Sequence, residues 1–92
     1  MIKTFRHKGL EQFFLTGSKK GIQPEHAKRL AQQLFMLNRA TGPEGMRVPG
    51  WRLHALTGEL KEHWSVWVNG NWRLTFKFED INAVLVDYQD YH

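Results

Sequence analysis

The chain has 92 residues, a formal net charge of +4, 41% hydrophobic residues and no cysteine. This length predicts one domain over residues 1–92 and the apolar content suffices for a core, while the lack of cysteine excludes a disulfide scaffold or a thiolate zinc module. No apolar run reaches the roughly 20 residues of a membrane span and no signal-peptide segment opens the chain, so we expect a cytoplasmic protein with no membrane partner.

The first half of the sequence predicts a short strand and two helices. Met1–Phe5 alternates apolar and polar residues like a strand, and Lys8–Thr16 gathers its apolar side chains on one helical face. Apolar residues at helical spacing also predict a helix over Pro24–Ala40, where proline suits the first turn. Three glycines and two prolines indicate a loop over Thr41–Gly50. The polar face of the longer helix would carry Lys28, Arg29, Gln32, Gln33 and Arg39.

The second half changes to the alternating pattern of strands. We expect strands over His63–Val68, Asn71–Phe78 and Ala83–Tyr88, with Asn69-Gly70 as a hairpin turn between the first two. Strands that follow one another through tight turns form an antiparallel sheet. The sequence therefore predicts an α+β fold in which two N-terminal helices pack on one face of a small antiparallel sheet.

The charge is distributed unevenly. Residues 1–61 carry eleven Lys/Arg against four Asp/Glu, a balance of +7, whereas residues 62–92 carry two against five, a balance of −3. The N-terminal part is therefore the candidate surface for contact with phosphate groups. A solvated basic face with no ligand has the same composition, so both interpretations stay open.

The sequence contains none of the common motifs that indicate a cofactor-binding or metal-binding site. It has no P-loop, G-x-G-x-x-G, H-E-x-x-H or G-x-S-x-G, and its histidines are too dispersed to indicate a metal site, so we expect neither group. A ribonuclease can work without metal, because it needs a base for the ribose 2′-OH, an acid for the leaving 5′-oxygen and a cation for the phosphate. The candidates for these roles are His54, Arg73, Asp90, Tyr91 and His92.

Each candidate also has a purely structural interpretation. Arg73 lies on the predicted strand opposite the apolar residues, where a guanidinium suits a phosphate but an ordinary exposed arginine is equally typical. His54 stands between two leucines, a position typical of a partly buried packing residue, although basic residues flank it. In Asp90-Tyr91-His92 an acid could orient a histidine that exchanges protons near neutral pH, or the three residues could simply end a strand.

Four segments of the sequence resemble one known family. Leu53–Gly58, Trp64–Val68, Asn71–Phe76 and Asp87–His92, together with the opening residues, resemble the HigB (host inhibition of growth) toxins of the RelE/ParE superfamily. The resemblance covers the whole chain, and the Asn-x-Trp-Arg hairpin combined with Asp-Tyr-His is its most specific part.

The resemblance implies a ribosome-dependent mRNA endonuclease of a type II toxin–antitoxin system. Such toxins act without metal in the A site of the 30S subunit, beside 16S rRNA, and leave a 2′,3′-cyclic phosphate and a 5′-hydroxyl. The implied partner is a helix-turn-helix antitoxin, HigA, through which alone the toxin would contact operator DNA. By position, His54, Asp90, Tyr91 and His92 match the family's catalytic residues and Arg73 its phosphate-binding arginine. The side chains that would hold RNA or the ribosome are Lys8, Lys19, Lys20, Lys28, Arg29, Arg52 and Lys61.

The sequence departs from the family at one position and leaves two other functions open. Thr57 stands where family members can carry a lysine, so one cationic contribution is in doubt, with Lys61 or Arg52 as possible substitutes. A ParE-like gyrase inhibitor would share the fold, but it has no need of proton-transfer groups at Asp-Tyr-His. A non-catalytic nucleic-acid-binding module lacks support from any recognition motif in this chain.

Overall fold

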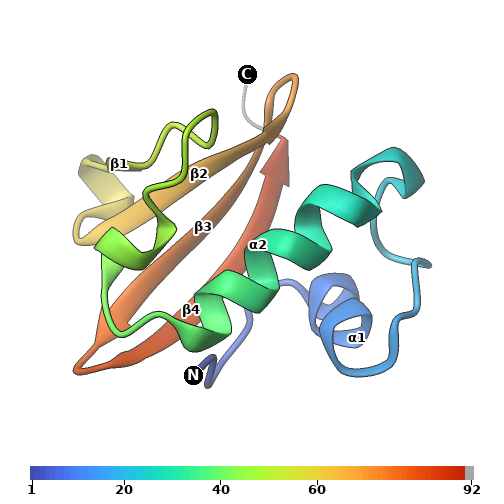
Figure 1. Ribbon diagram of the computed structural model, residues 1–92, viewed down its shortest axis with the longest axis horizontal. Coiled ribbons are helices and arrows are strands. Elements are labelled where there is room, and N and C mark those ends of the chain that lie inside the picture. The colour runs from blue at the N-terminus through green and yellow to red at the C-terminus, as the bar shows by residue number, and fades with distance from the viewer. Residues whose placement is uncertain (91–92) are drawn as a thin grey trace.

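Figure 1 shows the computed structural model, of which residues 1–90 are described here. Its helices are α1 (Lys8–Thr16) and α2 (Ala27–Arg39), and its strands are β1 (His54–Ala55), β2 (His63–Asn69), β3 (Trp72–Glu79) and β4 (Asn82–Asp90). The strands form one antiparallel sheet in the order β1-β2-β3-β4. The short 3-10 helices η1 (Pro24–His26), η2 (Pro43–Met46) and η3 (Gly58–Leu60) lie in the connections. The predicted α+β class is confirmed.

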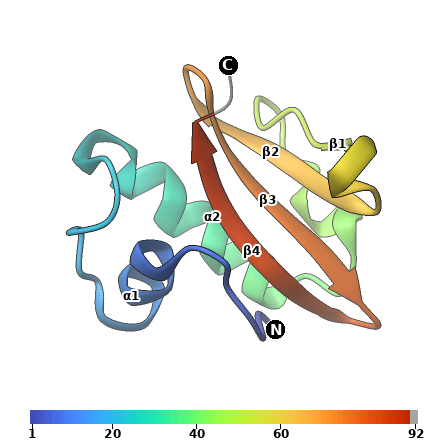
Figure 2. The same ribbon diagram turned by 180° about the vertical axis from the view of Figure 1, so that it is seen from behind.

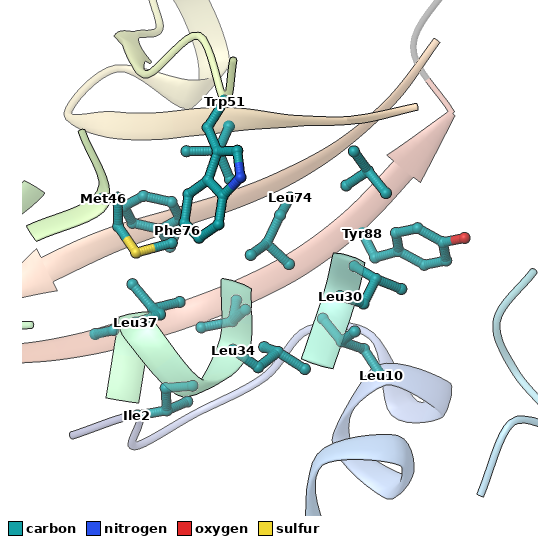
Figure 3. Close-up of a cluster of buried hydrophobic side chains, with 14 of the residues drawn as sticks. Ile2, Leu10, Leu30, Leu34, Leu37, Met46, Trp51, Leu74, Phe76 and Tyr88 are labelled. Atoms are coloured by element: carbon teal, nitrogen blue, oxygen red, sulfur yellow. The ribbon is translucent and has the colours of Figure 1, made fainter. Parts of the chain in front are cut away.

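α2 lies across one face of the sheet, and α1 lies beside α2 (Figure 1 and Figure 2). α2 crosses in front of the strands in Figure 1 and behind them in the reverse view of Figure 2, with α1 beside it. The leucines of α2 face the inward side chains of β3, of which Leu74 and Phe76 are fully buried (Figure 3). Met46 and Trp51, from the connection after α2, close the same core. No helix among the described residues has the length and apolar character needed to cross a membrane.

The segment predicted as the first strand pairs less regularly than expected. Ile2 and Phe5 form two isolated parallel bridges to Ala83 and Val86 of β4, not a continuous ladder. The reason lies in β4, where Leu85 adopts a left-handed conformation (φ 55°) and donates its backbone N–H to the hydroxyl of Thr4 at 2.8 Å. A non-glycine residue in that region interrupts regular pairing.

The prediction for the long helix was wrong at its start and on its polar face. The α-helix begins at Ala27, after the 3-10 turn η1. Gln33, predicted on the polar face, is fully buried and donates from Nε2 to the carbonyl of Trp67 at 2.9 Å. The β2–β3 register shifts between Trp67 and Asn69, which leaves this carbonyl for a side chain to satisfy.

The later boundaries follow the expected hairpins with two additions. The strand predicted to end at Tyr88 continues to Asp90, and a fourth strand, β1, contributes two residues at the sheet edge. The predicted loop Thr41–Gly50 contains the short helix η2, whose Met46 is fully buried.

A close backbone contact joins α1 to the connection that precedes η1. A Cβ built on Gly9 of α1 would lie 2.6 Å from the Cα of Gly21, and one built on Gly21 would lie 2.5 Å from the Cα of Gly9. Neither distance can be relieved by a side-chain rotation, because the neighbouring atoms belong to the backbone. Both positions therefore require glycine.

We predict that Gly9→Ala lowers the free energy of unfolding by about 1–3 kcal/mol, the usual cost of overpacking, despite the better helix propensity of alanine. Gly42→Ala is the matched control, since Gly42 has an extended backbone and a Cβ added there would meet nothing within 4 Å. Urea unfolding of the three proteins measures the difference. Equal midpoints for Gly9→Ala and the parent would contradict the contact.

Candidate functional site

The sheet face opposite the helices brings His54 and Arg73 together. His54 of β1 pairs with Ser65 of β2, which in turn pairs with Thr75 of β3. Since Leu74 and Phe76 point into the helix-covered core, the alternation of β3 directs Arg73 and Thr75 to the other face. These cross-strand pairings thus place an exposed histidine beside a half-buried arginine, 19 residues apart in sequence.

The partners of His54 define which nitrogen carries its proton. Nδ1 lies 2.9 Å from the backbone carbonyl of Arg52, while Nε2 lies 3.2 Å from Arg73 Nη1 and 3.3 Å from the hydroxyl of Ser65. A carbonyl only accepts and a guanidinium only donates. The contacts therefore fit a neutral imidazole with its proton on Nδ1 and its lone pair on Nε2, directed at Arg73.

The backbone before His54 is anchored on both sides. Trp51 is buried in the core and its carbonyl accepts from the backbone N–H of Trp67 at 2.6 Å. Arg52 takes a left-handed conformation (φ 54°), and its guanidinium lies over the Trp67 ring, 4.6 Å from the centroid. The Trp67 indole donates to the carbonyl of Gly70 at 2.9 Å, which fixes the ring itself. A cation–π contact thus helps to hold the carbonyl that accepts from His54.

His54 and Arg73 line a hollow of about 220 Å³. The remaining wall is Ala55, Leu56, Thr57 and Leu60. Thr57, which stands where members of the family can carry a lysine, therefore lines the same hollow. A lone pair and a guanidinium at one open site can accept a proton and contact a phosphate in the same ligand.

Asp90 lines a second hollow instead. In register, Asp90 lies opposite Trp72 and Gln89 opposite Arg73, so alternation separates Asp90 from Arg73. This second hollow, of about 360 Å³, shares no lining residue with the first. Its wall is Gln23, Glu25, His26, Asn69, Gly70, Asn71, Trp72 and Asp90.

Two buried side chains that can hydrogen-bond, His26 and Tyr88, lie at this second hollow, and His26 is part of its wall. The Tyr88 hydroxyl lies 2.6 Å from Nδ1 of the buried His26 and accepts from the backbone N–H of Gln23 at 3.3 Å. Burial raises the pKa of Tyr88, and the charges of Glu25 and Asp90 raise it further against the opposite effect of the Gln23 N–H. The phenol therefore keeps its proton while hydrogen-bonded to His26. The Tyr88 ring stacks on Trp72 with centroids 4.4 Å apart.

The other predicted residues are dispersed over the surface or lie outside the described part. The side chains of Lys8, Lys19, Lys20, Lys28, Arg52 and Lys61 are exposed, and Arg29 is half-buried with its guanidinium 5.6 Å from the Trp67 centroid. Tyr91 and His92 fall outside the described residues. Over residues 1–90, no three His, Asp or Glu side chains form a group that could hold a metal ion.

Sequence reasoning missed two side chains at these hollows. Ser65 is fully buried under His54, and its only sequence signal is a small polar residue in a strand otherwise rich in bulky ones. His26 lies in the short helix η1 that begins at Pro24. Nothing in the neighbouring sequence indicated its hydrogen bond, because its partner Tyr88 lies 62 residues away.

Comparison with known proteins gives two kinds of similarity. Residues 3–92 match the family model described as the RelE-like toxin of the type II toxin–antitoxin system HigB. The chain is 36% identical over 92 residues to a protein named Endoribonuclease HigB from Proteus vulgaris, covering all of both chains. It is 33% identical to Toxin HigB-1 of Vibrio cholerae serotype O1, covering all of this chain and 98% of the other.

A solved structure has the same fold at low sequence identity. The crystal structure of YafQ from Escherichia coli strain BL21(DE3) superimposes with a TM-score of 0.58 and 16% identity, over 98% of this chain and 93% of that one. At this identity the likeness bears on the architecture alone.

Proposed function

Because the chain belongs to the family of RelE-like HigB toxins of type II toxin–antitoxin systems, we propose that it is an endoribonuclease that cuts mRNA in the ribosomal A site without a metal ion. The observation that carries the proposal is the contact between His54 Nε2 and Arg73 Nη1 at one open hollow. It supplies a proton acceptor and a phosphate-binding cation side by side.

The reaction is an internal transfer within the RNA. The ribose 2′-oxygen attacks the adjacent phosphorus, its proton goes to a base, and the bond from phosphorus to the 5′-oxygen breaks as an acid protonates that oxygen. The products are a 2′,3′-cyclic phosphate and a 5′-hydroxyl. The guanidinium of Arg73 would stabilise the negative charge that builds on the phosphate oxygens in the transition state.

The proposed proton transfers are shared among His54, Asp90 and His92, with Tyr91 orienting the substrate by stacking or hydrogen bonding. The assignment of Asp90, Tyr91 and His92 is supported by their match to the family pattern. Asp90 lines the hollow beside Trp72, the residue that precedes Arg73 in β3, so an RNA strand crossing the hairpin end of the sheet would meet both hollows.

As a toxin of a type II system, the chain pairs with an antitoxin. We propose that this antitoxin is a helix-turn-helix protein of the HigA type, and that the toxin contacts operator DNA only through it. The other proposed partners are mRNA and the 16S rRNA of the 30S subunit. The exposed lysines of α1, α2 and their connection would hold that rRNA electrostatically.

We predict that His54→Ala slows cleavage of ribosome-bound mRNA by at least about a hundredfold, because it removes a proton-transfer group. Arg73→Ala and a chain lacking His92 should be impaired as well. Translation in vitro followed by primer extension on the mRNA measures the cuts.

The matched control is His7→Asn, which removes a histidine but keeps a side chain able to cap α1. It should cut as the parent does. Full cleavage by His54→Ala would contradict the catalytic assignment, and cleaved gyrase–plasmid complexes in place of cut mRNA would favour the gyrase inhibitor.

We also predict that replacing Lys19 and Lys20 by alanine weakens ribosome binding and flattens its salt dependence, since two phosphate contacts are lost. The control is Lys3→Ala combined with Lys77→Ala, which removes the same charge at other elements. Co-sedimentation with 30S subunits at several salt concentrations measures both. Identical binding by the two double variants would contradict a docking surface on the helices.

A further inference from the structure

The side chain of Ser65 contacts the His54 ring and is itself shielded from solvent. It is fully buried in β2, directly opposite His54 in the register, and its hydroxyl lies 3.3 Å from Nε2. The hollow is lined by His54 and Arg73 but not by Ser65. Ser65 therefore contacts the imidazole without being part of the wall that a ligand in the hollow would meet.

The position of the proton on His54 decides what this hydroxyl does. With Nδ1–H donated to the carbonyl of Arg52, Nε2 has a lone pair, and the Ser65 hydroxyl donates to it. A buried hydroxyl is costly to leave without a partner, so Ser65 favours the ring orientation that presents Nε2. Two contacts, one at each ring nitrogen, thus fix the rotation of the imidazole.

A hydroxyl can reverse its role, whereas a guanidinium cannot. After Nε2 has taken up a proton, the serine oxygen can accept from Nε2–H by rotation of its own hydrogen. Arg73, which has donors only, contacts Nε2 favourably only while that nitrogen has its lone pair. Ser65 is therefore the partner that can stay bonded to His54 before and after proton transfer.

We propose that Ser65 is a positioning residue that orients His54 so that Nε2 is the atom accepting the proton of the ribose 2′-OH, once the Arg73 guanidinium has turned from Nε2 to the substrate phosphate and the Ser65 hydrogen has rotated away. This rests on the proposed nuclease function and deepens it, by assigning the base among the candidate proton-transfer groups. The base is Nε2 of His54, the cation beside it is Arg73, and the protonation of the 5′-oxygen falls to another residue.

The test compares Ser65→Ala with the parent in ribosome-dependent cleavage and in two-bond ¹H–¹⁵N spectra of the histidine rings, assigned with His54→Ala. We expect Ser65→Ala to lower kcat by about tenfold, the effect of one net hydrogen bond, with KM unchanged. In the parent spectrum the proton of His54 should lie on Nδ1, and in Ser65→Ala the Nε2 resonance should shift, because one of the two donors at Nε2 is lost while Arg73 remains.

The control is Thr75→Val, which removes the neighbouring buried hydroxyl on β3 without a change in volume. It should leave kcat and the His54 signals as in the parent, and thermal melting checks that each variant folds. An unchanged kcat in Ser65→Ala, an equal loss in Thr75→Val, or a parent spectrum with the proton on Nε2 would each overturn the proposal. The spectra remain decisive even if the parent cuts no RNA, which separates this proposal from the nuclease function.

Discussion

The pairing of β1 with β2 is the constraint on which the site depends. β1 has two residues, yet its register sets His54 opposite Ser65 and, through β2, on the face of the sheet that carries Arg73. That pairing needs the backbone before it to be held, which the buried Trp51 and the contact of Arg52 with the Trp67 ring provide. The segment from Trp51 to Ala55 contains no helix and only a two-residue strand. It is held in place by β2, through Trp67 at its start and through the β1–β2 pairing at its end.

The alternation of side chains along the strands separates core packing from the candidate site. One face of β3 carries Leu74 and Phe76 into the core under α2, and the other carries Arg73 and Thr75. At one end of the helix-covered face, Tyr88 stacks on Trp72 and is hydrogen-bonded to the buried His26. These side chains lie beside the hollow that Asp90 lines. Arg73 and Asp90 therefore lie near the hairpin end of the sheet on its opposite faces, and His54 reaches Arg73 from β1.

Much of the fold could be predicted from periodicity, because apolar spacing reports directly on which face is buried. α1 and the hairpins followed it closely. His54 and Arg73 were candidates from the sequence itself, and the resemblance then matched them to functional positions of the family. Gln33 could not be predicted, since its burial depends on a carbonyl released by a register shift in a different element. The same holds for Ser65 and for the Gly9–Gly21 contact, which exist only once distant segments have met. The separation of Asp90 from Arg73 required the actual register of β4.

The chemistry of the cut ends tests the central claim most directly. If His54 and its neighbours transfer protons while the ribose 2′-oxygen attacks, mRNA cut on the ribosome by the purified protein must have a 2′,3′-cyclic phosphate on the upstream fragment and a 5′-hydroxyl on the downstream one. Mass spectrometry of the fragments identifies both groups. A 3′-hydroxyl with a 5′-phosphate, the products of attack by water with release of the 3′-oxygen, would contradict the account.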